Sequence, residues 1–341
     1  MAKKSVLIIY TGGTIGMVAD RRTGSLKAFD IGHILKNVPE LGKMNLRLES
    51  VSFAQPVDSS DIQPKHWIEI AELVYKNYNA FDGFVVLHGT DTMAYTASGV
   101  SFLLENLGKP VIFTGAQLPI GVLRTDAREN LITSVELAAH STNGKPTVPE
   151  VCVYFKNQLY RGNRSHKINS ELLQAFNSVN YPVLAEAGVN LNFYDDAIAS
   201  QPILPIKLYK KLDSNIAILK IFPGLSADVV KAVTAIKGLK ALILETYGSG
   251  NAPTEKWFVS AIKQAVNSGL IVLNVTQCYG GAVEQGKYET SRQLDEVGVV
   301  GGADLTTEAA VAKLMFLLGN YKSKEEILEL LGEPMRGELT L

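Results

Sequence analysis

The chain has 341 residues, of which 46% are hydrophobic and 20% are charged, and these proportions are typical of a globular protein of about two domains. Its 33 basic and 34 acidic side chains leave a net charge of −1, and no basic stripe favours a nucleic acid as partner. No apolar run approaches the roughly 20 residues that a membrane-spanning helix needs, and no secretory signal precedes the first strand, so we expect a soluble, cytoplasmic protein.

The sequence holds two cysteines, Cys152 and Cys278, which lie far apart. Their separation is not the short spacing of metal-ligand pairs, and disulfides are rare in cytoplasmic proteins. We therefore expect two buried thiols, and we predict neither a disulfide nor a zinc site.

The first predicted strand is the apolar run at 6–9, and it ends in the turn 10–16. The glycines at 12 and 13 let the backbone take positive φ and let a ligand approach closely. Ligands of open α/β sheets bind beyond the carboxyl ends of the strands. This turn should therefore present Thr14 at the mouth of a cleft.

The turn allows three interpretations. A tight turn with a capping threonine is the commonest use of such residues. A dinucleotide-binding turn needs G-x-G-x-x-G, whereas the glycines here are Gly12, Gly13 and Gly16, and no Gly-Lys-Ser/Thr follows for a P-loop. A hydroxyl nucleophile on the turn would require partners from elsewhere in the chain. Neither nucleotide motif is present, and the two cysteines lack metal-ligand spacing, so we predict no cofactor and no metal.

The segment after the turn is polar and has no sustained period. Residues 19–27 form either a lid over a neighbouring site or a plain surface loop. A short helix is expected at 31–38, where Pro39 ends it.

A strand at 46–53 leads to a group of polar side chains. Asp58, Ser59 and Ser60 offer a carboxylate and two hydroxyls at the end of this strand. They either cap the next helix, predicted at 64–78, or face a ligand.

The next segments repeat an apolar strand, a polar tip and an amphipathic helix. This is the βαβ rhythm of a parallel sheet with helices on its faces. The strands are expected at 83–87, 109–113 and 150–155, and the helices at 93–107 and 126–140.

A basic segment at 160–167 follows the last of these strands. It contains Arg161, Arg164, His166 and Lys167. A phosphate site, a solvated loop and a single lysine beside a threonine cleft are three open alternatives for this run.

The regular pattern weakens at 190–212, where two prolines and two aspartates interrupt it, and we place a linker at 191–212. The expected architecture is α/β, with two α/β domains: a larger one at 1–190 with a mostly parallel sheet flanked by helices, and a smaller one at 213–341. In the second domain, strands are expected at 215–221, 241–244 and 270–275, and helices at 227–236, 254–267, 306–318 and 323–331.

Four reactive side chains follow strands of the first domain. Thr14, Thr90, Asp91 and Lys167 should converge, because the carboxyl ends of parallel strands share one edge of the sheet. A threonine hydroxyl needs a base to remove its proton, and a lysine can serve if its charged form is disfavoured. Asp91 would orient Lys167, and Thr90 would relay the proton, while His88 is expected to be structural.

The segments 11–15 and 88–92 resemble the two signatures of the bacterial-type L-asparaginases. The resemblance covers nearly the whole chain, and both signatures occur in order and at the family's spacing. Without a signal peptide, the sequence is most similar to the type I, cytoplasmic branch. Further matching segments are 58–61, 160–164 and 301–304.

The resemblance implies hydrolysis of L-asparagine to L-aspartate and ammonia. Thr14 would be the acylated nucleophile, and Thr90, Asp91 and Lys167 would form a second triad that handles protons and water. By the same resemblance, the amino-acid head of the substrate, which also meets Thr90 and Asp91, would be bound by Asp58, Ser59 and Ser60. It further implies a homodimer, or a homotetramer built from tight dimers.

The sequence departs from the family pattern at several points. Family members often carry a tyrosine in the loop after the first signature, and residues 23–26 contain none. Some type I enzymes have a second asparagine site, at which Asn251 and Cys278 match. Glu245 stands there in place of an arginine that would bind the effector carboxylate, and His166 replaces a threonine, so we expect asparagine allostery to be absent or altered.

Two other functions are compatible with the same fold. One is an amidase subunit of a tRNA-dependent amidotransferase, although such subunits carry an added N-terminal domain and this chain begins directly at the first strand. The other is a non-catalytic sensor of asparagine or aspartate, which the four retained reactive side chains disfavour. Selectivity between asparagine and glutamine stays open, because one methylene in a pocket is worth only ~1–3 kcal/mol.

Overall fold

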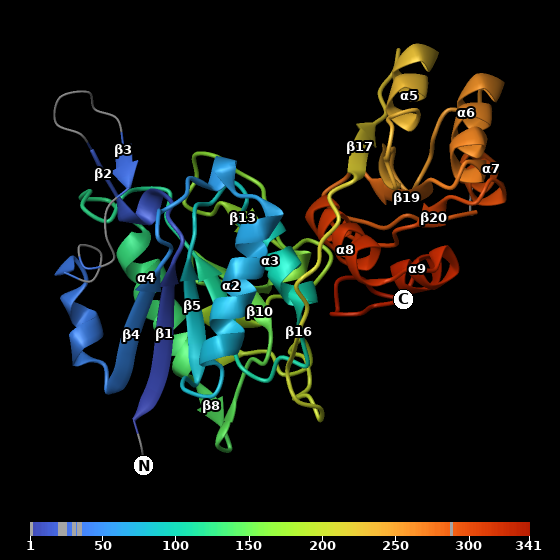
Figure 1. Cartoon of the computed structure of the whole chain (residues 1–341). Coiled ribbons are helices and arrows are strands. Elements are labelled where there is room, and N and C mark those ends of the chain that lie inside the picture. The colour runs from blue at the N-terminus through green and yellow to red at the C-terminus, as the bar shows by residue number, and fades with distance from the viewer. Residues whose placement is uncertain (1–2, 20–25, 29–31, 33–35, 287–288) are drawn as a thin grey trace. The chain divides into compact units, whose positions relative to one another are not determined.

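The structure, a computed structural model, describes residues 3–19, 26–28, 32, 36–286 and 289–341 (Figure 1). The chain divides into two compact units, Met1–Lys210 and Lys211–Leu341. Each unit has its own sheet and its own helices, which confirms the predicted α/β class with two α/β parts.

The first unit is built on a sheet of eight strands among the described residues. Five neighbouring strands run parallel, and the three at the other side are antiparallel. In spatial order the strands are β4 (Leu46–Ser52), β1 (Lys4–Tyr10), β5 (Gly83–Leu87), β7 (Val111–Thr114), β10 (Val151–Phe155), β11 (Gln158–Arg161), β14 (Ala185–Ala187) and β15 (Leu191–Phe193).

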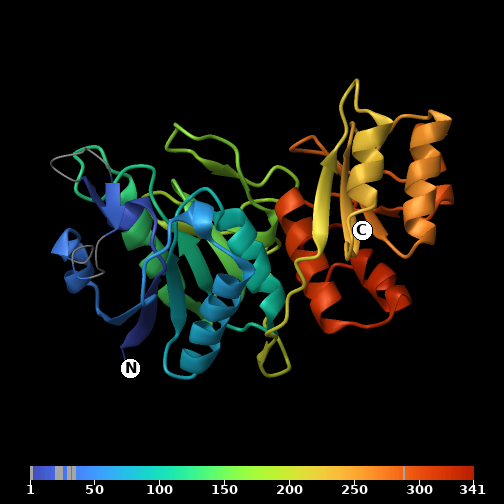
Figure 2. The ribbon, with the colours of Figure 1, turned by 45° about the horizontal axis from the view of Figure 1, so that its top comes forward.

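Helices cover both faces of this sheet. Helices α2 (Pro64–Asn77) and α3 (Met93–Leu103) pack together on one face, and α4 (Ala127–Ala139) lies on the other (Figure 2). Pro64 at the first turn of α2 supplies a backbone already suited to a helix start. The buried residues of α2 recur at helical spacing, so one stripe of the helix faces the core. They are Trp67, Ile70, Ala71 and Val74.

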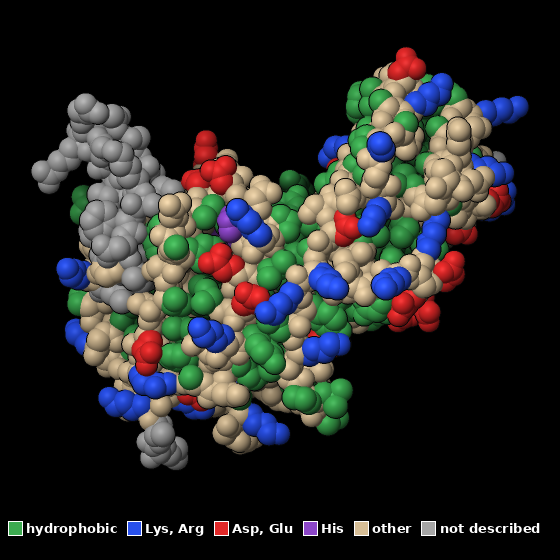
Figure 3. Space-filling view, in the orientation of Figure 1, with side chains coloured by type: hydrophobic (Ala, Val, Ile, Leu, Met, Phe, Trp, Pro, Cys, Tyr) green, Lys and Arg blue, Asp and Glu red, His purple; other side chains and the backbone are tan. Residues whose placement is uncertain are grey.

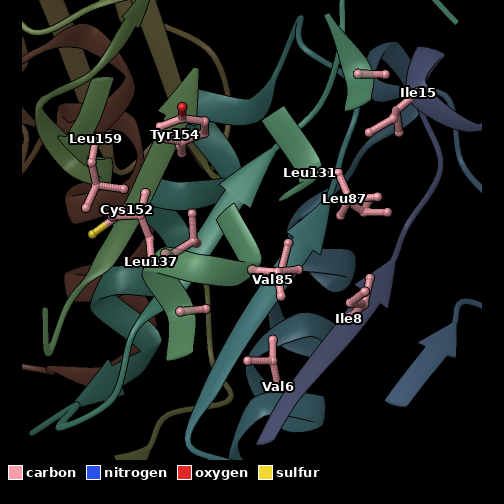
Figure 4. Packing of buried hydrophobic residues seen from close by; sticks show 14 of the residues in the cluster. Val6, Ile8, Ile15, Val85, Leu87, Leu131, Leu137, Cys152, Tyr154 and Leu159 are labelled. Atoms are coloured by element: carbon pink, nitrogen blue, oxygen red, sulfur yellow. The ribbon is translucent and has the colours of Figure 1, made fainter. Parts of the chain in front are cut away.

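The core between the sheet and α4 follows from the strand period of two. Val6 and Ile8 of β1 point to the same side as Val85 of β5, and Leu131 of α4 packs against them (Figure 4). All four side chains are fully buried. The continuous apolar strands predicted from the sequence are therefore buried on both faces, as parallel strands between two helical layers must be.

Two predicted boundaries differ from the structure. The helix expected at 93–107 ends at Leu103, because residues 104–105 leave the helix as β6 (Leu104–Glu105) and pair with β16 (Lys207–Leu208). The segment expected as a linker, 191–212, contributes β15 and β16 to the first unit, which extends to Lys210. Short strands of two or three residues have no period that a sequence pattern can reveal.

The basic segment 160–167 also has more regular structure than a loop. It consists of the end of β11, the 3₁₀ turn η4 (Gly162–Arg164) and β12 (His166–Lys167). Strand β12 pairs antiparallel with β13 (Phe176–Asn177), so Lys167 lies opposite Phe176 in a small hairpin.

The predicted loop at 19–27 and the predicted helix at 31–38 lie largely outside the described residues. The ends of the loop form an antiparallel pair, β2 (Met17–Ala19) and β3 (Leu26–Ala28). Past the expected helix, Pro39 begins the 3₁₀ turn η2 (Pro39–Lys43). A further short pair joins β8 (Ser141–Thr142) to β9 (Lys145–Pro146).

The second unit has a smaller, fully parallel sheet of four strands among the described residues. The strands are β17 (Ile216–Lys220), β18 (Ala241–Thr246), β19 (Ile271–Thr276) and β20 (Val300–Gly301). The helices are α5 (Ala227–Thr234), α6 (Lys256–Asn267), α7 (Glu289–Glu296), α8 (Thr307–Asn320) and α9 (Lys324–Leu331).

Helix α7 is not predicted by the sequence pattern. Its sequence, ETSRQLDE, is almost entirely polar, and only Leu294 is apolar. That leucine is buried in the core of the second unit. A single apolar residue does not establish a helical period, so the pattern could not indicate this helix.

The surface of each unit carries both signs of charge. On the face that Figure 3 shows, lysine and arginine side chains are interspersed with aspartate and glutamate, and no continuous field of one sign forms among the described atoms. Within the part of the chain that the structure describes, every helix is too short or too polar to cross a bilayer.

Candidate active site

The register of the first unit aligns the ends of three parallel strands. Tyr10 of β1 lies opposite Leu87 of β5, and Leu87 lies opposite Thr114 of β7. The three loops that follow, at 11–14, 88–92 and 115–117, therefore leave the sheet side by side at its carboxyl edge.

Two glycines allow the first loop to touch its neighbours. Gly12 and Gly13 have φ of 129° and 89°, which disfavours residues with a Cβ. A Cβ on Gly12 would lie 2.2 Å from the Val57 carbonyl oxygen, and one on Gly13 would lie 2.3 Å from the Gly89 backbone nitrogen. Since Gly13 precedes Thr14 and Gly89 precedes Thr90, backbone contact brings the two threonine-bearing loops together. Thr14 begins the 3₁₀ turn η1 (Thr14–Gly16).

Thr90, Asp91 and Lys167 meet directly. The Lys167 ammonium Nζ donates to Thr90 Oγ1 at 2.8 Å and to Asp91 Oδ1 at 2.6 Å. The Lys167 side chain is 17% exposed, whereas that of Asp91 is 63% exposed. The lysine is thus held inside the site, and the aspartate remains open to solvent.

The donor and acceptor roles in this cluster are fixed by chemistry. An ammonium has donors only, so the Thr90 oxygen must accept from Lys167 and is left with its own proton to donate. The Asp91 carboxylate balances the lysine charge at hydrogen-bond distance. Such a cluster can hold a hydroxyl in one orientation and can pass a proton through it.

The residues 58–60 lie beside this cluster. The Ser59 hydroxyl Oγ donates to Asp91 Oδ2 at 3.4 Å, and Thr92 Oγ1 donates to the Ser59 carbonyl at 2.6 Å. The Asp58 carboxylate accepts from the Ser60 backbone nitrogen at 2.9 Å and from its hydroxyl at 2.8 Å. Asp58 therefore caps the short turn η3 (Ser59–Asp61), and it does not cap α2.

His88 is part of the strand end and is fully buried. Its Nδ1 lies 2.7 Å from the Gly89 carbonyl oxygen, which can only accept, so the proton is assigned to Nδ1. Burial lowers the pKa of His88 to about 4, and the ring is therefore neutral at pH 7. Its ring packs against Phe113 of β7, with centroids 6.0 Å apart and an interplanar angle of 64°. The environment agrees with the structural role expected for this histidine.

The two arginines of the basic segment serve the core of the first unit. Arg161 is 7% exposed and forms an ion pair with Glu150, and its guanidinium lies 4.3 Å from the centroid of the Tyr181 ring. Arg164 is 2% exposed and stacks on the same ring at 5.1 Å. Of the three alternatives for this segment, the structure favours the single lysine beside a threonine.

One residue in contact with the cluster was missed as a candidate. Gln117 Oε1 accepts from Thr90 Oγ1 at 3.3 Å, and Gln117 Nε2 donates to the Leu172 carbonyl at 3.2 Å. The sequence did contain an indication, because residues 115–117 follow a buried strand of the same sheet. Residues beyond the carboxyl ends of parallel strands lie at the edge where ligands bind.

The carboxyl edge of the sheet in the second unit contains Glu245, which lies opposite Lys220 at the end of the β17–β18 pairing. Glu245 Oε1 accepts from Thr307 Oγ1 at 2.7 Å, and Oε2 lies 3.6 Å from Lys220 Nζ. His166, in the first unit, lies opposite Asn177 in the β12–β13 hairpin.

The two cysteines differ in accessibility. Cys152 is fully buried, and its burial raises the pKa of the thiol well above the ordinary value. Cys278 is exposed, which contradicts the expectation of two buried thiols. It follows the turn after β19, where the chain leaves the core. Among the described residues, no group of three or more His, Cys, Asp or Glu side chains is arranged to hold a metal ion.

Two family models match most of the chain, one in each unit. The sequence model of "Asparaginase, N-terminal" matches residues 5–199, and that of "Glutaminase/Asparaginase C-terminal domain" matches residues 215–331. The chain is 41% identical to L-asparaginase 1 of Escherichia coli strain K12, over 100% of this chain and 99% of that protein. It is 34% identical to a subunit of the glutamyl-tRNA(Gln) amidotransferase of Pyrococcus abyssi, over 98% of this chain and 76% of the relative.

The fold matches as well as the sequence. The crystal structure of L-asparaginase I from Vibrio cholerae is similar with a TM-score of 0.90 at 39% identity, and the match covers 100% of both chains. By both sequence models, and by identity along its whole length, the chain belongs to the asparaginase family of amidohydrolases.

Proposed function

We propose that the protein hydrolyses L-asparagine to L-aspartate and ammonia at the carboxyl edge of the larger sheet. The observation that supports this most strongly is the contact of Lys167 with both Thr90 and Asp91, next to the glycine turn that carries Thr14. The 41% identity to a protein named L-asparaginase 1 supports the substrate.

In the proposed reaction, Thr14 is the nucleophile. Its hydroxyl oxygen attacks the side-chain amide carbon of asparagine, the carbon–nitrogen bond breaks, and ammonia leaves with the proton that the hydroxyl loses. The product of this step is an ester between Thr14 and the aspartyl group. A threonine at a glycine-rich strand end suits this role, because little side-chain bulk surrounds the approach to its oxygen.

Thr90, Lys167 and Asp91 act on the second step. For this step Lys167 first gives one proton to solvent, and its neutral amine takes the hydroxyl proton of Thr90 while Thr90 takes a proton from the water molecule that attacks the ester carbonyl. The proton then passes to the Thr14 oxygen as the ester bond breaks. Aspartate is released and Thr14 is restored. The Asp91 carboxylate keeps the lysine oriented toward Thr90 throughout.

The residues 58–60 bind the amino-acid head of the substrate in this proposal. The Asp58 carboxylate suits the α-ammonium group, and the hydroxyls and backbone nitrogens of Ser59 and Ser60 suit the α-carboxylate. In the resting site both Ser60 donors are engaged with Asp58, so they turn to the α-carboxylate when the α-ammonium group pairs with Asp58.

The protein is further proposed to work in the cytoplasm as a homodimer or homotetramer. The family resemblance supports both statements. Light scattering of the purified protein measures the mass of the assembly, and a monomer at micromolar concentration would contradict this proposal.

The relative named as part of an amidotransferase suggests a second candidate function, the delivery of ammonia within a larger complex. A protein of that kind would hydrolyse free asparagine slowly without its partners, and a sensor would not hydrolyse it at all. Turnover of the isolated protein therefore separates the three functions.

The test is steady-state release of ammonia from L-asparagine, with L-glutamine measured in parallel over a range of concentrations. We expect turnover of about 1–10³ s⁻¹ with asparagine, which is the usual range for enzymes. Absence of ammonia release from a folded sample would overturn the proposed function.

A further inference from the structure

We infer that Gln117 is a positioning residue of this site, whose single side-chain amide holds Thr90 and the Lys167 hairpin in register. The inference rests on the proposed hydrolysis, and it adds a residue to which neither motif of the family resemblance extends. Gln117 lies in the loop after β7, which is the strand next to β5 in the sheet.

The orientation of the Gln117 amide follows from its two partners. The Leu172 carbonyl oxygen, 3.2 Å away, can only accept, so the group facing it must be the amino group. The amide oxygen therefore faces Thr90 Oγ1 at 3.3 Å. An inverted amide would set two oxygens against each other at Leu172.

This orientation fixes the proton of Thr90. The Thr90 oxygen accepts from the Lys167 ammonium at 2.8 Å, so its own hydrogen must be directed elsewhere. Gln117 Oε1 is the acceptor within reach. In the resting site the orientation of the Thr90 hydroxyl is therefore set by two hydrogen bonds. Lys167 donates to its oxygen, and Gln117 accepts its hydrogen.

The other end of the amide reaches the loop of the lysine hairpin. Leu172 lies in the segment that joins β12 to β13, and β12 carries Lys167. The Asn169 side chain accepts from the backbone nitrogens of Glu171 and Leu172, each at 2.8 Å, and so holds this loop in a turn. Gln117 thus links Thr90 to the hairpin that bears the partner of Thr90.

The backbone of Gln117 is held in place by residues at the start of α4. Its backbone nitrogen donates to both oxygens of Asp126, at 3.1 and 3.0 Å, and the Leu118 nitrogen donates to Asp126 Oδ1 at 3.1 Å. Asn130 Nδ2 donates to Asp126 and to the Gly115 carbonyl. Because α4 anchors the loop, the Gln117 side chain can impose its geometry on Thr90 instead of following it.

Loss of this amide should leave Thr90 bound by Lys167 alone, with a free hydroxyl rotor and a less constrained hairpin. The contacts to the substrate head at residues 58–60 do not involve Gln117. We therefore expect its removal to lower kcat with little change in KM, since the proton route is affected and ground-state binding is retained.

The experiment compares Gln117→Met, Gln117→Glu and the control Gln158→Met. Gln158 is also half-buried and bridges a hydroxyl and an oxygen, because it accepts from Tyr160 at 2.6 Å and donates to Glu186 at 3.3 Å. It also accepts from Gln174, and it makes no hydrogen bond to Thr90, Asp91 or Lys167. Gln117→Met removes both contacts, whereas Gln117→Glu keeps an oxygen toward Thr90. Ammonia release from L-asparagine is measured, and crystal structures are determined for both methionine variants.

We expect Gln117→Met to lower kcat by about tenfold or more with KM nearly unchanged, Gln117→Glu to recover part of the loss, and Gln158→Met to match the parent. The structure of Gln117→Met should show the Thr90–Lys167 contact broken or redirected. A parent that turns over, together with a Gln117→Met variant of normal kcat and unchanged Thr90 geometry, would overturn the inference. An inactive parent would overturn the proposed function, and the crystal structures would then decide the positioning role by themselves.

Discussion

Two lysine–carboxylate pairs, one in each unit, have almost the same length and opposite surroundings. Lys167 Nζ lies 2.6 Å from Asp91 in the first unit, with side chains that are 17% and 63% exposed. Lys313 Nζ lies 2.7 Å from Glu338 in the second unit, and both side chains are 0% exposed. The ion pair by itself therefore does not distinguish a reactive site from a structural one.

The remaining partners of each lysine make the difference. Lys313 also donates to the carbonyls of Leu331 and Glu333, at 3.1 and 2.6 Å, and every one of these acceptors is inert. Lys167 instead donates to the hydroxyl of Thr90. Lys313 thus ties the C-terminal segment to α8, whereas Lys167 holds a group that can exchange a proton.

The largest expected effect is on turnover at the first unit. Thr14→Ala removes the proposed nucleophile and should lower kcat by several orders of magnitude, as loss of a nucleophile does in other hydrolases. The change removes a hydroxyl from a turn, so the midpoint of thermal unfolding should stay close to that of the parent. A Thr14→Ala variant with near-normal turnover would show that the nucleophile is assigned wrongly.

The next prediction concerns the reactive lysine. Lys167→Met should lower kcat by about 10²–10⁴-fold, the usual contribution of a proton-transfer group. Its effect on the free energy of unfolding should stay below about 1 kcal/mol, because Asp91 can be solvated once the lysine is gone. Urea titration and ammonia release measure the two quantities. Full activity of this variant would remove Lys167 from the proton route.

The same substitution at Lys313 should have the opposite effect: a large loss of stability and little change in kcat. Lys313→Met leaves the Glu338 carboxylate buried without its cation, which typically costs about 3–5 kcal/mol of unfolding free energy. The double variant Lys313→Met/Glu338→Gln should recover part of this loss. If Lys313→Met unfolded at the same urea concentration as the parent, the pair would not hold the C-terminal segment.

The pH dependence of stability tests a third buried group, His88, which has no oppositely charged partner within the described part of the chain. The folded state binds a proton at His88 only near pH 4, whereas the unfolded chain binds one near pH 6.5. The unfolded state therefore binds more protons in this window, so stability is full above it and falls as the pH drops from 6.5 to 4. The parent should lose about 3 kcal/mol more than His88→Asn over this range. Equal pH dependence of the two unfolding curves would contradict the neutral, buried state of His88.

The smallest effect concerns regulation through the second unit. By the family resemblance an effector carboxylate would bind near Glu245, whose own carboxylate is engaged with Thr307 and Lys220. We expect hyperbolic kinetics with asparagine, and no change of curve shape in Asn251→Ala. Sigmoidal kinetics that this substitution abolishes would refute the prediction.

Much of the first unit could be predicted from sequence because its strands are buried on both faces. Runs such as 83–87 are continuously apolar, and their polar tips identify the edge of the sheet. That rule places Thr90 and Asp91 correctly, because both follow the parallel strand β5. Lys167 does converge with them, but the expected reason was wrong: it follows the antiparallel strand β11 and reaches the edge from the β12–β13 hairpin. The catalytic roles of all three stay predictions.

The parts that were missed depend on contacts between distant segments. The helix at 93 ends early because β6 pairs with a strand about a hundred residues later. Cys278 is exposed because its segment leaves the core after β19, and no local pattern indicates this. Gln117 was at the correct edge, but its reach to Thr90 depends on how α4 anchors its loop.

The most direct test of the difference between the two units compares one threonine from the carboxyl edge of each sheet. Thr90 lies in the loop 88–92 of the first unit and accepts from Lys167, whereas Thr246 ends β18 of the second unit and donates to Asn274 at 2.6 Å. Ammonia release from L-asparagine should be measured for Thr90→Ala and Thr246→Ala at equal concentrations of folded protein. We predict that Thr90→Ala loses several orders of magnitude in kcat and that Thr246→Ala keeps the value of the parent. Comparable kcat for Thr90→Ala and the parent would contradict the account.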